Sequence, residues 1–158
     1  MKIGVLSDTH LGEVNPCLRE ILSSHFAEAE MIIHAGDLVG TEVLRCLQGG
    51  NLEAVRGNMD HPDVKKLLPD KKVISVGSFQ IGIIHGWGSP IGIEDRIQSQ
   101  FENVQCIVFG HTHNSVNRWQ DGILFFNPGS PTDKRFAKNN SVGILEIGEE
   151  IRGHIISL

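Results

Sequence analysis

The chain has 158 residues, of which 40% are hydrophobic and 21% charged, and its formal net charge is −5. This length and composition are typical of a soluble globular protein, and no repeat or linker divides the chain, so we expect one domain over residues 1–158. The acidic balance argues against a basic surface for nucleic acid, and no stretch approaches the ~18 apolar residues of a membrane span. Stable nucleic-acid binding and membrane insertion are therefore not expected.

The number and spacing of the cysteines indicate the redox environment in which the protein works. Cys17, Cys46 and Cys106 lie far apart and form no CxxC pair. An odd number of widely spaced cysteines argues against both a disulfide framework and a zinc ribbon. The first residues enter an apolar stretch without the basic region and long apolar segment of a secretory signal. These features predict a cytoplasmic protein.

The first half of the chain alternates short apolar runs with amphipathic ones. Residues 2–8 predict a strand, and Asn15 and Pro16 are cap and first-turn signals for a helix that ends near residue 27. A strand, a helix closed by two glycines and a further strand follow at residues 31–37, 41–48 and 52–58. This β-α-β-α-β order predicts a parallel sheet with right-handed crossovers.

The second half predicts mainly hairpins. Residues 71–76 and 79–86 flank a turn at Gly77 and Ser78, and the Asp-Gly pair at residues 121–122 is a strong signal for a second hairpin. A helix over 93–101, a buried strand over 106–110 and a final strand pair over 141–148 and 151–158 complete the pattern. The predicted fold class is mixed α/β, with two packed sheets, helices on their outer faces and about ten strands.

Five of the apolar runs end in side chains that can bind metal. These side chains are Asp8 and His10, Asp37, Asn58, His85, and His111 with His113. Ligands of open α/β sheets bind at the carboxyl ends of the strands, so we expect these groups to converge on one crevice. Each short motif alone is more typical of an ordinary turn or a core histidine, and the prediction depends on the repetition.

The number of ligands favours two metal ions. Seven protein groups are too many for one open first-row site, which uses roughly four to six ligands including water. Asp37 lies between the two clusters in sequence and has two oxygens, so we expect it to bridge two ions roughly 3.5 to 4 Å apart. His111 and His113 would then each reach a different ion.

Other chemically active side chains are assigned simpler roles. His25, His34, His61 and His154 are expected to be solvated or packed in the core, with Asp60 and His61 retained as groups at the edge of the site. Trp87 and Trp119 are expected to be packing residues rather than platforms for stacking a base.

The motif set resembles a known family. Asp8-Thr9-His10, Gly36-Asp37, Gly57-Asn58, His85 and Gly110-His111-Thr112-His113 stand in the order found in the calcineurin-like metallophosphoesterases. The whole chain is similar to the small single-domain YfcE-like phosphodiesterases, and the NPGS segment at residues 127–130 is similar to one near their C-terminal part. The resemblance implies a four-layer αββα sandwich of two mixed sheets, with the site at their rim.

The resemblance also implies which residues hold each ion. One ion would be held by Asp8, His10, Asp37 and His113, and the other by Asp37, Asn58, His85 and His111. Asp37, Asn58 and Asp60 are expected to act in catalysis. The implied cofactors are two divalent ions, with Mn²⁺ the first choice and Ni²⁺, Fe²⁺, Zn²⁺ and Co²⁺ as alternatives.

The implied activity is hydrolysis of a small phosphodiester by metal-activated hydroxide in line with the leaving oxygen. The sequence departs from the family pattern at Met59, because many relatives carry histidine there and a thioether donates no proton.

Two alternative functions stay open: a catalytically weak interaction scaffold resembling a eukaryotic retromer subunit, and a small nuclease. An uncovered edge strand would allow a homodimer or homotetramer.

Overall fold

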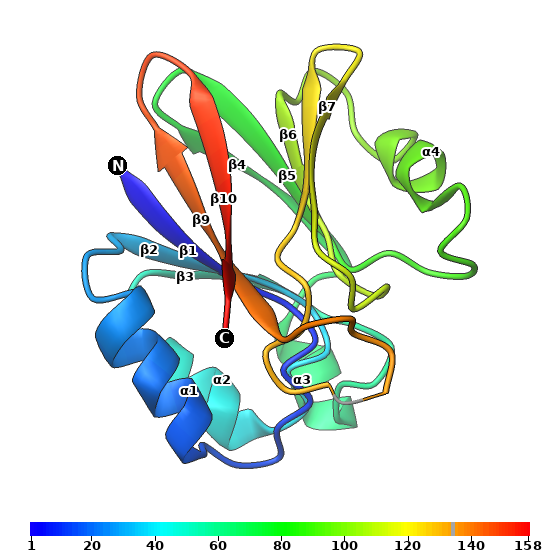
Figure 1. The fold of residues 1–158 in the computed structure, drawn as a ribbon. Helices are drawn as coiled ribbons and strands as arrows, with labels where there is room; N and C mark the ends of the chain where they lie inside the picture. Colours follow the sequence, from blue (N-terminus) through cyan, green and yellow to red (C-terminus); the bar gives the residue numbers. More distant parts are fainter. Residues whose placement is uncertain (134) are drawn as a thin grey trace.

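The structure, a computed structural model, describes residues 1–133 and 135–158 and contains two five-stranded mixed sheets (Figure 1). The first sheet has the order β10-β9-β1-β2-β3. Its strands are β1 (Lys2–Leu6), β2 (Met31–Ala35), β3 (Leu52–Val55), β9 (Ser141–Ile147) and β10 (Ile151–Ser157). Strands β1, β2 and β3 run parallel, whereas β9 is antiparallel to both β1 and β10. The predicted parallel unit and the final strand pair are therefore confirmed.

The second sheet has the order β4-β5-β6-β8-β7. Its strands are β4 (Lys71–Val76), β5 (Phe79–Ile84), β6 (Cys106–Val108), β7 (Val116–Gln120) and β8 (Ile123–Asn127). Strands β5, β6 and β8 are parallel, and β4 and β7 are the antiparallel outer strands. Both predicted hairpins are present, and each sheet has a parallel trio at its centre or edge.

Helices cover the outer faces of the two sheets. Against the first sheet lie α1 (Pro16–Glu20) with its π-helical continuation η1 (Ile21–His25), α2 (Thr41–Leu47) and α3 (Pro62–Leu67), and against the second lies α4 (Ile93–Gln98) (Figure 1). None of the described helices is long and apolar enough to cross a membrane. The layer order is therefore helices, sheet, sheet and helix, as the four-layer prediction states.

Three apolar clusters hold these layers together, and alternate residues of a strand belong to different ones. In β1, Ile3 and Val5 pack between the two sheets, whereas Leu6 packs against α1 and α2. Similarly, Val108 of β6 points between the sheets and Ile107 packs against α4. Because both faces of the central strands are buried, the strand ends have fixed positions.

Helix α3 is an element that the sequence analysis missed. His61 is its N-cap and accepts a hydrogen bond from the Asp63 backbone N–H, and Pro62 occupies the first turn. Lysines occupy its last turn, so start and stop signals were available. Val64 is its one buried residue, which leaves no apolar periodicity to detect.

Candidate metal centre

The polar side chains that follow the parallel strands gather at one edge of the molecule. Two overlapping groups form, one of Asp8, His10 and His113 and the other of Asp8, Asp37 and His85, with ligand atoms within 4.8 Å of one another in each group. These residues follow β1, β2, β5 and β6, which belong to different sheets. The packing of the sheets thus brings together side chains up to 105 positions apart, from Asp8 to His113.

Asp8 and Asp37 each present one carboxylate oxygen to the histidines. Asp8 Oδ2 accepts a hydrogen bond from the His111 backbone N–H, at 3.0 Å, and Asp37 Oδ1 accepts one from the Met59 N–H, at 2.7 Å. The other oxygens face inward: Asp8 Oδ1 lies 3.3 Å from His113 Nε2, and Asp37 Oδ2 lies 3.3 Å from His85 Nε2. Backbone amides therefore fix the orientation of both carboxylates.

Asp8 belongs to both groups, whereas the sequence analysis names Asp37 as the bridge. Asp37 Oδ2 also faces both groups, because it lies 3.9 Å from His10 Nε2 and 3.3 Å from His85 Nε2. Asp8 Oδ1 lies 3.9 Å from the same two nitrogens. Either carboxylate thus lies close to histidines of both groups.

Three of the histidines have one ring nitrogen held by an oxygen acceptor. His85 Nδ1 donates to the Ala35 carbonyl at 2.8 Å, and His113 Nδ1 donates to Asp133 Oδ2 at 2.6 Å. A carbonyl or carboxylate oxygen can only accept, so Nδ1 carries the hydrogen and Nε2 is left to bind metal once the ring is neutral. His111 has the opposite arrangement, since its Nε2 lies 2.9 Å from the Gly88 carbonyl oxygen.

The donor set fits a divalent cation. Asp8 Oδ1 and His85 Nε2 are buried and have no hydrogen-bond partner among the described residues. The Nε2 atoms of His10 and His113 lie 3.2 Å apart, and both are close to Asp8. Buried polar atoms without partners are costly, and a cation bound by these oxygens and nitrogens would satisfy them.

Asn58 and His111 lie beside these groups. Asn58 is exposed and lines the same surface cleft as His85, and the His111 ring stands edge-on to His85 with centroids 5.4 Å apart. The structure thus brings all seven predicted ligands to one edge of the sheets, with five of them in the compact groups.

The backbone at this edge adopts costly conformations. Asp8, His10, Asp37, Val39, His111 and His113 all have positive φ angles, between 46° and 80°. Left-handed conformations of residues other than glycine are uncommon and cluster at functional sites. Glycines permit the close packing, because a Cβ at Gly57 would lie 2.1 Å from Asp37 Oδ1 and one at Gly110 would lie 2.7 Å from Asp8 Oδ2.

Asp60 is buried behind the site rather than within either ligand group. Its carboxylate accepts hydrogen bonds from the backbone N–H groups of Asp37, Val39 and Gly57, at 3.2, 2.6 and 2.6 Å. These bonds tie the turn after β2 to the turn after β3. His61, the other predicted edge residue, is exposed at the start of α3.

The segment after β8 supports the site from the other side, and the sequence analysis missed its main residue. Ser130 Oγ donates to the Asp8 carbonyl and accepts from the backbone N–H of Asp133, whose carboxylate contacts His113. Asn127 Nδ2 donates to the Gly110 carbonyl. The NPGS segment was the available signal, because it ends at Ser130, three positions before Asp133.

Burial and charge together set the protonation of the site. Burial is the largest single influence on both groups and opposes ionisation. The contact between Asp37 and His85, together with the Met59 N–H at Asp37 and the Asp8 carboxylate near His85, nevertheless lowers the pKa of Asp37 and raises that of His85. The carboxylates of Asp8, first, and Asp133 raise the pKa of His113 to about 9. A cation bound to His113 Nε2 at neutral pH would therefore have to displace a proton from that ring.

His34 has the opposite shift. It is fully buried, with Nε2 3.1 Å from Thr9 Oγ1, and burial lowers its pKa to about 4. An unfolded histidine has a pKa near 6.5, so the unfolded state binds the proton first as pH falls. The contribution of neutral His34 to stability is therefore complete above pH 6.5 and is lost toward pH 4.

We expect His34→Gln, whose side chain does not titrate, to remove this pH dependence. Between pH 7 and 4.5 the metal-free wild type should lose about 2 kcal/mol more unfolding free energy than the variant. Urea denaturation at the two pH values measures the difference, with exposed His25→Gln as the matched control. Equal losses in wild type and His34→Gln would show that His34 is not the titrating group.

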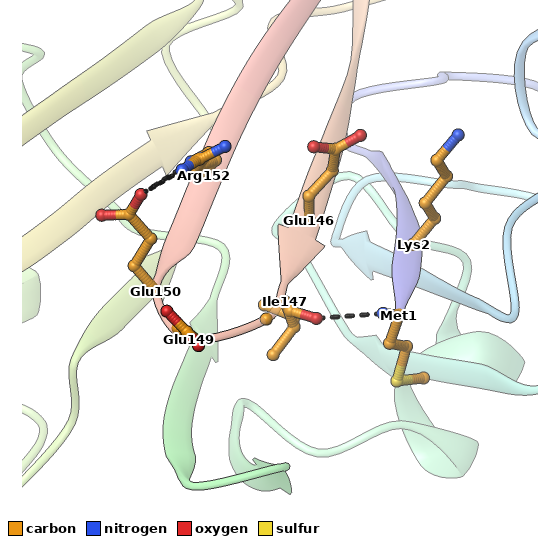
Figure 2. Close-up of a pocket in the computed structure, with 8 residues that line it drawn as sticks. Met1, Lys2, Glu146, Ile147, Glu149, Glu150 and Arg152 are labelled. Carbon is orange, nitrogen blue, oxygen red and sulfur yellow. Dashed lines mark hydrogen bonds and ion pairs between the residues drawn. The ribbon is translucent and has the colours of Figure 1, made fainter.

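A hollow of about 730 Å³ lies away from these residues. Figure 2 shows the side chains that line it. Its walls include Met1, Lys2, Glu146, Glu150 and Arg152, and Arg152 pairs with Glu150. Lys2 begins β1, whereas Asp8 and His10 follow its other end. This hollow is therefore at the opposite end of the first sheet from the candidate metal centre.

Comparison with known proteins agrees with this geometry. The family model of the calcineurin-like phosphoesterase superfamily domain matches residues 1–150. A relative from Methanothermobacter thermautotrophicus, named a probable metallophosphoesterase, is 35% identical over 163 residues, which cover 99% of this chain and 92% of the relative.

Two solved structures are also similar. One, described as a novel archaeal phosphodiesterase, superposes with a TM-score of 0.78 at 27% identity over 99% of this chain and 100% of the other. Zinc-bound Vps29 from Entamoeba histolytica has a TM-score of 0.71 at 22% identity, over 99% of each chain, and supports the fold alone. The family match over residues 1–150 and the archaeal relatives show that the chain belongs to the calcineurin-like phosphoesterase superfamily and is a metallophosphoesterase.

Proposed function

We propose that the protein hydrolyses phosphodiesters with two divalent ions. Asp8, His10, Asp37 and His113 would hold one ion, and Asp37, Asn58, His85 and His111 the other. The observation that carries the proposal is that the two ligand groups share Asp8, and that Asp8 and Asp37 each face histidines of both groups. When bound, such ions supply Lewis acidity toward the phosphate oxygens and lower the pKa of water, and Mn²⁺ is the first ion to test.

The proposed ligand side chains are held in place by hydrogen bonds within the chain before any metal binds. Asp8 and Asp37 each have one oxygen held by a backbone N–H, and His85 and His113 have Nδ1 held by Ala35 and Asp133. Fixed ligands need little rearrangement on binding, and they keep donor atoms aimed at one place. We assign Asp60 to the same positioning role, because its carboxylate oxygens are engaged by three backbone N–H groups.

Met59 limits the choice of leaving group. Its thioether cannot donate a proton, and its side chain is 59% exposed beside the site. General acid catalysis is worth roughly 10²- to 10⁴-fold, so its absence at this position favours leaving groups that depart as stable anions. Aryl diesters should be better substrates than alkyl diesters.

The complete ligand set favours an enzyme over the alternative functions. A binding scaffold would not need seven metal-competent side chains, strained backbone at six positions and histidines oriented by acceptors. A nuclease for long nucleic acid would need a basic surface, and the net charge is −5.

The proposed function is tested with metal-free protein and a panel of esters. We expect no hydrolysis of bis(p-nitrophenyl) phosphate after chelation, restored activity with Mn²⁺ and slower turnover of alkyl diesters. Cleavage of bis(p-nitrophenyl) phosphate releases p-nitrophenolate, which absorbs strongly, so the reaction can be followed continuously. Failure of the Mn²⁺-loaded protein on every diester of the panel would contradict the proposal.

Asp133 provides a test of the histidine orientation. We expect Asp133→Asn to lower the affinity for Mn²⁺ by roughly 10- to 100-fold, because the amide is a weaker acceptor for His113 Nδ1–H. Calorimetry measures the affinity, and ¹⁵N NMR of the imidazole reports the tautomer. Exposed Glu149→Gln is the control, and unchanged affinity with an unchanged His113 tautomer would rule out this role.

A further inference from the structure

A surface cleft of about 690 Å³ opens beside the candidate metal centre. Asn58 and His85, two members of the predicted second ligand set, form part of its wall. The remaining wall comes from the end of β3, from α3, from the start of β4 and from the segment after β5. Small-molecule sites have volumes of roughly 300 to 1,000 Å³, so the cleft has room for far more than one phosphate group.

The wall of the cleft carries positive charge in an acidic protein. Arg56 pairs through two nitrogens with Asp70, at 2.6 and 2.8 Å, so these two charges offset each other. Lys65 Nζ donates to the Asn58 carbonyl at 2.6 Å, and Lys71 Nζ donates to the Gln100 carbonyl at 2.8 Å. Within residues 1–133 and 135–158 neither ammonium has a carboxylate at salt-bridge distance. Two uncompensated cations thus line a concave surface, which concentrates anions there.

Neighbouring lysines show that this pattern is local. Lys66 follows Lys65 on α3 and pairs with Asp63 at 2.9 Å. Lys72 follows Lys71 on β4 and pairs with Glu53. Neither Lys66 nor Lys72 lines the cleft. Carboxylates therefore neutralise Lys66 and Lys72 outside the cleft, whereas Lys65 and Lys71 within it have no carboxylate partner among the described residues.

Trp87 adds an aromatic surface to the same wall. Its side chain lines the cleft and is 46% exposed, so the expectation of a packing residue is not confirmed. Arg96 donates to the carbonyl groups of Trp87 and Ile91, at 3.1 and 3.0 Å, which ties this loop to α4. An exposed indole on an ordered loop offers a face on which a planar ring can stack, worth roughly 1 to 3 kcal/mol per base in nucleotide complexes.

We propose that this cleft binds the part of the substrate beyond the scissile phosphate and selects a nucleotide-type group. Such a group combines a planar base, which stacks on Trp87, with a second phosphate, which pairs with Lys65 and Lys71. An alkyl or lipid substituent would cover both ammonium groups without offering them an anionic partner, which is costly. This inference rests on the proposed function, because the metal centre must hold the first phosphate.

Binding of a product-like probe tests the inference directly. Adenosine 3′,5′-bisphosphate carries a base and two phosphates, whereas adenosine 5′-monophosphate lacks the second phosphate. We expect the Mn²⁺-loaded wild type to bind the bisphosphate at least tenfold more tightly by calorimetry. Lys71→Met and Lys65→Met should each reduce this preference about fivefold and weaken its dependence on salt. Trp87→Ala should weaken both nucleotides about tenfold without changing the affinity for inorganic phosphate.

Matched variants separate the cleft from general charge effects. Lys66→Met and Lys72→Met remove the same charge next to each cleft lysine and should leave the preference unchanged. Equal affinity for the two nucleotides, or equal effects of Lys71→Met and Lys72→Met, would overturn the inference. Hydrolysis of bis(p-nitrophenyl) phosphate in the same samples shows whether the proposed function holds, so a failed cleft and a failed active site give different results.

Discussion

Asp37→Asn is expected to reduce kcat/KM for bis(p-nitrophenyl) phosphate by roughly 10³-fold, or about 4 kcal/mol of transition-state stabilisation. Asp37 uses Oδ1 to accept from the Met59 N–H and presents Oδ2 to His10 and His85. An amide has one oxygen. If that oxygen keeps the bond to Met59, the NH₂ group faces the metal centre, where it cannot bind a cation.

The variant should remain folded because it can keep the bond to Met59. We therefore expect an unchanged thermal transition of the metal-free protein together with a fall in bound Mn²⁺ from two ions per chain to one or none, measured by elemental analysis. Exposed Asp95→Asn is the matched control. Retention of more than a tenth of the activity with full metal content would refute a bridging role for Asp37.

Asp60→Asn should act mainly on stability, with an expected loss of about 2 to 4 kcal/mol. The Asp60 carboxylate accepts from the backbone N–H groups of Asp37, Val39 and Gly57, and hydrogen bonds to charged groups contribute about 1.5 to 3 kcal/mol each. The amide leaves at least one of these buried donors without an acceptor. Urea denaturation of the metal-free protein measures the loss.

The same variant distinguishes positioning from direct catalysis. Because the turn that carries Asp37 depends on Asp60, we also expect weaker Mn²⁺ binding, with activity recovering at high Mn²⁺ concentration. Exposed Asp63→Asn, three residues away, is the control. A large fall in kcat at saturating metal with wild-type stability would instead assign Asp60 to the reaction itself.

The sequence predicts the fold well where buried runs alternate with clear breaks. The strands predicted over residues 2–8, 31–37 and 52–58 correspond to β1, β2 and β3, which are parallel and each end two or three residues earlier than predicted. The Asp-Gly turn at 121–122 joins β7 to β8. Helix α3 escapes detection because it buries a single side chain. The position of β9 beside β1 depends on contacts across the whole chain, which local patterns do not contain.

The candidate site was predictable because parallel strands end at the same edge of a sheet. The residues that support the metal ligands are harder to predict from the sequence. Asp60 follows Gly57 and Asn58 and so resembles an ordinary turn residue, although its carboxylate is buried and ties two turns together. Asp133 reaches His113 across 20 positions that include the β7–β8 hairpin, a separation at which no local periodicity applies.

The arrangement of the ions is tested most directly by anomalous diffraction from crystals of the protein grown with Mn²⁺. The proposal predicts two anomalous peaks beside Asp37, one among Asp8, His10 and His113 and the other among Asn58, His85 and His111. A single peak, or peaks remote from these side chains, would contradict a dinuclear centre at the carboxyl ends of the strands.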